Sequence, residues 1–271
     1  MSKPIVTKYD AISERVKKPL KIALVADLHE RRAVDILNLL RAQQPDMILV
    51  AGDTLERYCE NRYQSTVKRR FNPIRWLIVN MIFYINSFFM ILRPKRSKPD
   101  TKNAYSFLRQ AADIAPVYLS LGNHEEELMP EDREFFRNNG IHCLDNEETE
   151  AVVNSNFMLI GGLSDEYDEE WLKSFAEKDE FRLLLCHNPN YYETLNIKDT
   201  DIDLIVSGHN HGGQIRIFSM GVAGAGGKLF PKYDKGIYDK RLIVSAGCSN
   251  TAAIPRVNNP RELVIINLKN R

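Results

Sequence analysis

The chain has 271 residues, which suffices for one α/β domain with a large core or for two small domains. Its 37 Lys and Arg residues nearly balance 36 Asp and Glu residues, and the net charge of +1 argues against a globally basic nucleic-acid binder. The four cysteines are scattered without a CxxC pair, which is not the pattern of a zinc knuckle or a disulfide framework and favours a reducing compartment. Residues 1–20 form a polar lead without the apolar core of a signal peptide, so we expect a cytoplasmic protein.

Three predicted strands in the first half of the chain end in polar side chains. The apolar run at 20–26 is typical of a central strand buried on both faces, and the runs at 45–51 and 115–121 repeat the pattern. The side chains that follow these runs are Asp27, His29, Asp53, Asn123 and His124. Because α/β proteins bind ligands beyond the carboxyl ends of their strands, we expect these side chains to face one pocket.

Each of these positions also has a simpler interpretation. Asp27 is equally suited to cap the helix predicted at 31–43, Asp53 is suited to a turn, and 122–125 to a capped loop. The repetition of one pattern at three strand ends favours the ligand interpretation. Asn123 offers a neutral oxygen ligand, and His124 beside it is a candidate acid. Further helices are predicted at 103–112 and 131–139.

Residues 57–100 interrupt this pattern with an apolar insertion. Nearly every residue of 71–92 is apolar, basic clusters flank it, and its length is close to the roughly 20 residues of a membrane span. A single span would separate the candidate ligands that precede it from those that follow it, so we exclude one. We expect a helix that contacts the membrane surface or covers the active site, and a buried helix or dimer contact is the alternative.

Histidines follow two further predicted strands. Residues 181–186 end at His187, and residues 201–206 lead to Gly208-His209-Asn-His211. A lone histidine after a strand is more often structural, but His187 is the fourth repeat of the same pattern. We expect His142 to be structural or on the surface, and the glycine-rich residues 221–227 to form a flexible loop near the site. The remaining predicted strands are 156–161, 214–218, 241–244 and 262–268.

The combined set offers two carboxylates, one amide oxygen and four imidazoles as metal ligands: Asp27, His29, Asp53, Asn123, His187, His209 and His211. Mixed oxygen and nitrogen donors suit Mn²⁺, Fe or Zn²⁺ better than Mg²⁺ or Ca²⁺, and we expect Mn²⁺ to activate in vitro. Seven ligands suit two ions, which at about 3.5–4 Å apart can hold a bridging hydroxide and clamp a phosphoryl group. No Walker-type loop, nucleophile elbow or GxGxxG competes with this prediction.

These motifs resemble the calcineurin-like metallophosphoesterase superfamily, and they occur in its order. They are Asp27-x-His29, Gly52-Asp53, Gly122-Asn-His124-Glu125, His187 and Gly208-His-x-His211. Residues 207–216 and 253–263 are most similar to the branch of YkuE- and YaeI-type phosphodiesterases. The resemblance implies a single domain over 1–271 with a four-layer α/β fold, in which helices flank two packed mixed β-sheets and 57–100 is an insertion.

The resemblance also implies a role for each residue. One metal would take Asp27, His29 and His211, the other would take Asn123, His187 and His209, and Asp53 would bridge them. His124 would protonate the leaving oxygen or stabilise the transition state. Arg57 lies near the position of the phosphate-binding arginine of Ser/Thr protein phosphatases, but the rest of that motif is absent, so we do not favour a protein phosphatase.

We therefore expect a metal-dependent phosphodiesterase that acts at a membrane surface, peripheral on the inner face of the cell membrane. Its phosphoester substrate carries a lipid in one version of this hypothesis and is water-soluble in another. One alternative is an enzyme like UDP-2,3-diacylglucosamine pyrophosphatase. The other is a binding scaffold that has lost catalysis, which the presence of every expected ligand disfavours.

Overall fold

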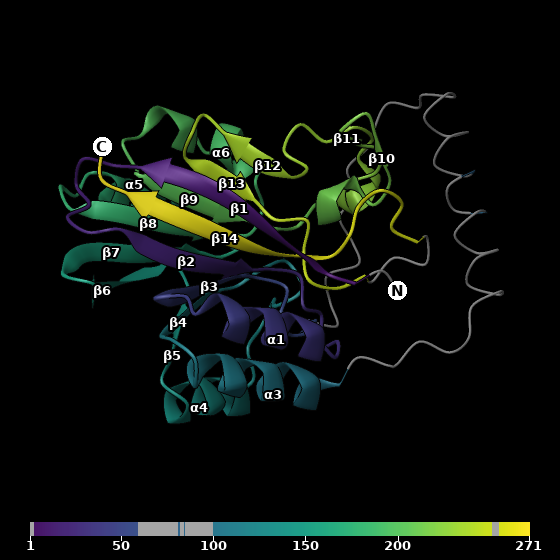
Figure 1. The fold of residues 1–271 in the computed structure, drawn as a ribbon, viewed down its shortest axis with the longest axis horizontal. Coiled ribbons are helices and arrows are strands. Elements are labelled where there is room, and N and C mark those ends of the chain that lie inside the picture. The colour runs from purple at the N-terminus through teal and green to yellow at the C-terminus, as the bar shows by residue number, and fades with distance from the viewer. Residues whose placement is uncertain (1–2, 59–80, 82–83, 85–99, 251–254) are drawn as a thin grey trace.

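The computed structural model describes residues 3–58, 81, 84, 100–250 and 255–271. In this part of the chain, two six-stranded sheets lie face to face with helices on their outer sides (Figure 1). The first sheet has the order β1 (Ile5–Ile12), β14 (Glu262–Lys269), β2 (Leu20–Val25), β3 (Met47–Ala51), β4 (Val117–Ser120) and β5 (Ile141–Leu144). The second has the order β12 (Gly236–Tyr238), β13 (Leu242–Val244), β9 (Leu204–Ser207), β8 (Phe181–Cys186), β7 (Asn156–Leu163) and β6 (Glu147–Val153).

Both sheets are mixed, with a parallel centre. In the first sheet β2, β3, β4 and β5 run parallel, while β14 is antiparallel to β2 and parallel to β1. In the second sheet β7, β8, β9 and β13 run parallel, and the edge strands β6 and β12 are antiparallel to their neighbours. The carboxyl ends of the parallel strands of each sheet therefore share one edge.

Alternation along the strands builds three apolar layers. On β2, Ile22 and Leu24 point between the two sheets, where they pack with residues of β8 and β9 such as Leu183 and Val206. Their neighbours Ala23 and Val25 point to the outer face, against the helices of the first sheet. This arrangement explains why 20–26 reads as one uninterrupted apolar run, since both faces of the strand are buried.

Helices cover the outer face of each sheet (Figure 1). The helices α1 (Val34–Gln43), α3 (Thr101–Ala112) and α4 (Pro130–Asn138) pack on the first sheet. The helices α5 (Glu169–Ala176) and α6 (Tyr191–Thr194) pack on the second. Short 3₁₀ turns are η1 (Ile197–Asp199), η2 (His211–Gly213) and η3 (Ala225–Gly227), and a separate hairpin is formed by β10 (Arg216–Ile217) and β11 (Met220–Gly221).

The predicted fold class is confirmed, since two mixed sheets are flanked by helices. Residues 1–20, for which the sequence indicated only a polar lead, contain a strand that was not predicted. Residues 5–12 form β1, an edge strand that pairs with β14 and leaves most of its side chains partly or fully exposed, so its sequence lacks an apolar run. The strands β5, β6 and β12 were not predicted either. All three lie at sheet edges. Strands β5 and β12 are short, and β6 has polar residues that face outward.

The predicted apolar insertion at 57–100 lies outside the described residues, apart from its two ends and two isolated positions. Its helical character, its membrane contact and its place in a single domain remain predictions. Of the helices in the described part of the chain, none combines the length and apolar character that a membrane crossing requires.

Candidate metal centre

The predicted ligand residues lie at the carboxyl ends of five parallel strands. Asp27 and His29 follow β2, Asp53 follows β3, and Asn123 follows β4, and these three strands are neighbours in the first sheet. His187 follows β8, and His209 and His211 follow its neighbour β9 in the second sheet. Because the two sheets are stacked, their loops meet at one edge of the molecule, and the site draws on both sheets.

One cluster brings together Asp27, His29 and His211, whose ligand atoms all lie within 4.8 Å of one another. His29 Nε2 is 3.3 Å from His211 Nε2, and His211 Nε2 is 3.7 Å from Asp27 Oδ1. The other ring nitrogen of His29, Nδ1, points away to Glu56 Oε1 at 2.9 Å. The free Nε2 atoms and the carboxylate thus converge on one point.

A second cluster brings together Asp53, His187 and His209, again with ligand atoms within 4.8 Å. His187 Nε2 lies 3.1 Å from Asp53 Oδ2 and 3.3 Å from His209 Nδ1. Asn123 Oδ1 joins the cluster at 2.7 Å from His209 Nδ1. His187 Nδ1 is 2.7 Å from the carbonyl oxygen of Ala51, so the main chain of β3 fixes the ring with Nε2 facing the cluster.

Asp53 lies between the two clusters. Its Oδ2 atom is 3.6 Å from His29 Nε2 and 3.1 Å from His187 Nε2, so one carboxylate oxygen faces an imidazole of each cluster. His124 Nε2 is 3.8 Å from the same oxygen, and His29, Asp53 and His124 form a third group within 4.8 Å. The central place of Asp53 is what a bridging ligand requires.

The backbone at these residues is unusual. Asp27, His29, Asp53, His209 and His211 all have positive φ, between 48° and 73°. Residues other than glycine seldom adopt this region, although Asn, Asp and His tolerate it better than most. Such conformations concentrate at functional sites, where the surrounding structure compensates for their cost. The local backbone therefore turns these side chains toward one point at a cost in conformational energy.

Two glycines allow the loops to approach closely. A Cβ atom on Gly52, which has φ of 73°, would lie 2.7 Å from Cγ of His187. A Cβ atom on Gly122 would collide with Asp53 Oδ1 and lie 2.9 Å from His187 Cδ2. Glycine at these two positions is thus a steric requirement of the site.

Burial and neighbouring charges perturb the site electrostatically. Burial opposes charge on both groups of the Asp53–His187 pair, yet their mutual attraction prevails. It holds the pKa of Asp53 well below its usual range and raises the pKa of His187 to about 10. Burial and the charge of His187 lower the pKa of His209 to about 3, and burial together with His29 lowers the pKa of His211. Neutral imidazoles at positions 209 and 211 are the form that ligates a metal.

The environment of Asp27 indicates that the site accommodates a cation. Asp27 is fully buried, and burial raises the pKa of its carboxyl group. Its Oδ1 accepts the main-chain N–H of His209 at 3.0 Å, but its buried Oδ2 has no hydrogen-bond partner among the described residues. A buried carboxylate oxygen without a partner is costly, and a metal ion is the partner that its histidine neighbours favour. The seven residues therefore fit a pair of metal ions by position and by donor type.

Three charged residues outside the predicted ligand set support the site. Glu56 accepts from His29 Nδ1 and from His124 Nδ1, each at 2.9 Å, and also contacts the hydroxyl of Tyr58. Glu125 is buried and accepts the N–H groups of residues 53, 54, 55 and 122, which ties the loop after β3 to the loop after β4. Arg256 places Nη2 3.3 Å from His211 Nδ1. Of the three, Glu125 stands in the predicted motif at 122–125, and Glu56 lies three positions after Asp53.

The structure also decides between the alternatives for Asp27, Arg57 and His142. Asp27 does not cap the following helix, because α1 begins after Ala33 without a side-chain cap. Arg57 is held by the carboxylates of Asp132, at 2.7 and 2.8 Å, and Glu30, at 3.0 Å, so it belongs to a structural ion network. His142 is exposed on β5 and stacks on Tyr118, away from both clusters.

The glycine-rich residues 221–227 lie beside the site. The side chain of Asn210, between the two histidines of the loop after β9, accepts from the N–H of Ala225 at 3.2 Å and donates to the carbonyl oxygen of Tyr233 at 2.8 Å.

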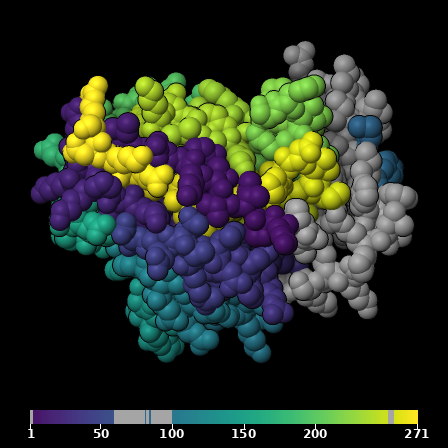
Figure 2. All heavy atoms as spheres, viewed as in Figure 1, coloured from purple at the N-terminus to yellow at the C-terminus, as the bar shows by residue number. Residues whose placement is uncertain are grey.

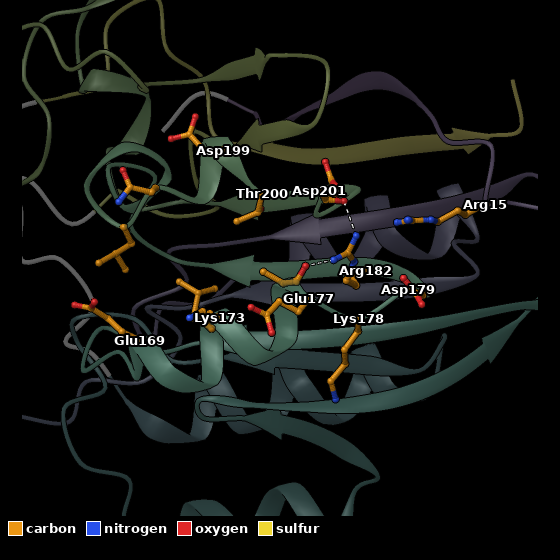
Figure 3. A pocket seen from close by; sticks show the side chains of 14 residues that line it. Arg15, Glu169, Lys173, Glu177, Lys178, Asp179, Arg182, Asp199, Thr200 and Asp201 are labelled. Atoms are coloured by element: carbon orange, nitrogen blue, oxygen red, sulfur yellow. Dashed lines mark hydrogen bonds between the residues drawn. The ribbon is translucent and has the colours of Figure 1, made fainter.

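Two cavities flank different parts of the fold. One of about 450 Å³ adjoins Gly122 and Asn123. Another, of about 560 Å³, lies among Arg15, α5 and η1 (Figure 3). It contains none of the predicted site residues, and its buried Arg182 donates to the carbonyl oxygen of Asp201 at 2.9 Å.

Comparison with known proteins decides the family. Residues 20–213 match the sequence model described as calcineurin-like phosphoesterase. The chain belongs to the calcineurin-like phosphoesterase family. The match covers the segment that carries all seven ligand candidates and His124, and the predicted resemblance to this superfamily is confirmed.

Curated relatives within this phosphoesterase family are moderately similar. Phosphodiesterase YaeI of Escherichia coli is 28% identical, over 75% of this chain and 64% of that protein. The uncharacterized metallophosphoesterase Cj0846 of Campylobacter jejuni is 27% identical, over 99% of this chain and 64% of that protein. The uncharacterized protein YpbG of Bacillus subtilis is 26% identical, over 76% of this chain and 66% of that protein. The alignments thus span just under two thirds of these relatives' own length.

Proposed function

We propose that this chain is a metal-dependent phosphodiesterase with a binuclear centre. The observation that carries the proposal is the position of the Asp53 carboxylate between two clusters of imidazoles and carboxylates, at 3.1 and 3.6 Å from His187 and His29. A single structural ion would need one such cluster. A scaffold without metal would have no use for a buried Asp27 oxygen that has no hydrogen-bond partner in the described part of the chain. Membership of the phosphoesterase family supports the same conclusion.

The first ion would be held by Asp27, His29 and His211, the second by Asn123, His187 and His209, and both by Asp53. Bound here, two transition-metal ions would lower the pKa of a water nucleophile. Their positive charge would offset the negative charge of the phosphoryl oxygens. The mixed oxygen and nitrogen donors favour Mn, Fe or Zn over Mg or Ca.

His124 is the residue that we propose transfers the proton to the leaving oxygen. Glu56 accepts from Nδ1 of its ring at 2.9 Å, and Nε2 faces the centre at 3.8 Å from Asp53 Oδ2. The side chain is 29% exposed, whereas those of His29 and His187 are buried, so its ring is more accessible to a substrate. A carboxylate on one ring nitrogen orients the ring and stabilises its protonated form, as proton transfer requires.

We further propose that the enzyme acts at a membrane surface on phosphodiesters, with lipid-linked ones as the preferred class. The apolar residues 71–92 between two basic clusters support this in the sequence. The relative YaeI, which is named a phosphodiesterase, supports the diester preference.

Metal removal tests the proposed activity. Protein stripped with a chelator should hydrolyse an aryl phosphodiester no faster than buffer, and adding back Mn²⁺ should restore turnover at about two ions per chain. The diester should be preferred over the corresponding aryl phosphomonoester. Elemental analysis and product absorbance are the readouts. A folded protein that binds one ion or none, and stays inactive with Mn²⁺, Fe²⁺ and Zn²⁺, would reject the proposal.

Glu56→Gln should weaken metal binding by roughly 10–100-fold, because an amide has one acceptor oxygen and cannot serve the Nδ1 atoms of both His29 and His124. Competition with a fluorescent chelator measures the affinity. The matched control is Glu148→Gln, on β6, whose carboxylate contacts Trp171 and Lys178 and no site residue. Equal affinities in the two variants would show that Glu56 does not support the centre.

A further inference from the structure

The hairpin β10–β11 presents an exposed apolar tip. Phe218, in its turn, is 92% exposed, and its neighbours Ile217 and Met220 are 51% and 57% exposed. Hydrogen bonds from the N–H of Phe230 to the carbonyl oxygen of Val222, and from the N–H of Arg216 to that of Val257, join two adjoining segments to the hairpin. We call Ile217, Phe218, Met220, Phe230 and Val257 the apolar tip; the last two are 60% and 43% exposed.

The turn holds Phe218 in an unfavourable backbone conformation. Phe218 has φ of 46° and Ser219 has φ of 70°. Two-residue hairpin turns with positive φ at both positions strongly favour Asn-Gly or Asp-Gly, and a bulky aromatic residue there is an outlier. The cost is not repaid by packing, because the ring is almost wholly exposed. A strained residue that gains no packing within its own chain is a candidate contact for another molecule.

The base of the hairpin is firmly tied to the fold. Arg216 Nη1 donates to the carbonyl oxygen of Gly212 at 3.0 Å and pairs with Asp234 Oδ2 at 3.0 Å, and the N–H of Gly221 also donates to Asp234. The hairpin stands apart from both large sheets, at the end of the molecule opposite the labelled C-terminus (Figure 1), and it forms part of the surface there (Figure 2). The hairpin that carries the apolar tip is therefore anchored to the fold at its base.

The surrounding sequence is basic. Residues 214–241 contain six basic residues and two acidic ones, a net charge of +4 in a chain whose total is +1. Two of these basic residues, Lys232 and Lys235, pair with Glu193 and Glu262, which lie outside the segment. Lys228, Lys232 and Lys240 in this segment are exposed. A segment that combines exposed apolar side chains with exposed lysines matches the chemistry of an anionic bilayer surface, whose acyl region takes up the former and whose headgroups attract the latter.

We propose that the apolar tip docks on the surface of an anionic lipid bilayer. This inference deepens the proposed membrane-surface action, on which it rests, but it concerns residues other than 71–92. The 3₁₀ turn η2, which begins with His211, ends three positions before β10 begins. Docking through the hairpin thus brings the metal-binding edge next to the lipid headgroups, where phosphodiesters are concentrated.

The test is co-sedimentation of the full chain with vesicles of phosphatidylcholine, alone or mixed with phosphatidylglycerol. The parent protein should bind the mixed vesicles more tightly. The double variant Phe218→Asn with Ser219→Gly should lose about tenfold or more in vesicle affinity, because it removes the most exposed aromatic ring. It should also raise the thermal midpoint by about 2 °C, because the new residues suit a turn with positive φ. Phe157→Asn, at a 40% exposed phenylalanine on β7, should leave vesicle binding unchanged.

Equal vesicle binding by the double variant and the parent would overturn the proposal. So would a parent protein that ignores vesicles but self-associates through the hairpin in a size measurement. Turnover of a soluble aryl phosphodiester separates this test from that of the proposed function. Lost vesicle binding with full turnover supports the docking surface and leaves catalysis intact, while a parent that binds vesicles through the tip but hydrolyses nothing would reject the catalytic proposal alone.

Discussion

Asp53→Asn should reduce metal content from about two ions per chain to less than one. It should also lower turnover by more than the roughly 10–100-fold that is typical of losing a residue that hydrogen-bonds a metal ligand. The substitution keeps the shape of the side chain and its acceptor for the N–H of His124. It removes the charge that faces Nε2 of both His29 and His187. Because one carboxylate faces both clusters, both ions should be lost together. Elemental analysis after dialysis against a fixed metal concentration measures this.

The control for this variant is Asp203→Asn. Asp203 is also largely buried, but it lies at the opposite end of β9, where it accepts from Ser13, Arg15 and the N–H of Arg182. Its loss should lower the thermal midpoint and leave two ions bound. If both variants lose metal equally, the loss reports general destabilisation. If Asp53→Asn keeps two ions, Asp53 does not bridge.

His124→Asn should lower turnover by about 10²–10⁴-fold while both ions stay bound. Its Nε2 is the most distant of the three imidazole nitrogens around Asp53 Oδ2, at 3.8 Å, and its ring is partly open to solvent. Both features are typical of a residue that contacts the substrate, and neither is expected of a residue that is enclosed by metal ions. The change also leaves Glu56 free to orient His29.

His142→Asn is the matched histidine control, since His142 stacks on Tyr118 at the surface of β5. Its turnover and metal content should equal those of the parent. Loss of an ion in His124→Asn would instead assign His124 to the group that it forms with His29 and Asp53. Unchanged turnover in that variant would remove His124 from the proton-transfer step.

The candidate site residues stand out in the sequence because they follow buried parallel strands. Such strands are apolar on both faces, so β2, β3, β8 and β9 stand out in the sequence, and the polar residue after each run marks a strand end. The convergence of strand ends from two sheets was implied by family resemblance, since nothing in the apolar runs themselves assigns a strand to one sheet or the other.

Other features depend on tertiary structure that local sequence does not encode. The edge strand β1 has mostly polar outward residues and becomes a strand by pairing with β14. Arg256 reaches His211 across 45 positions in the sequence, so its place in the site follows from the fold alone. Glu125 forms part of a predicted motif, but its function of joining two loops is visible only in its four main-chain hydrogen bonds.

The place of β14 has a consequence for the order of folding. This strand lies between β1 and β2, and Thr7 Oγ1 donates to Glu262 Oε2 across a separation of 255 positions. During synthesis, β2 therefore presents an open edge until residues 262–269 have emerged and docked, although the loops after β2, β3 and β4 are made long before. Such long-range closure is slow, and an open apolar edge invites pairing with other chains. The loops after β2, β3 and β4 are synthesised first, but the sheet that positions them is complete only after β14 has paired with β2.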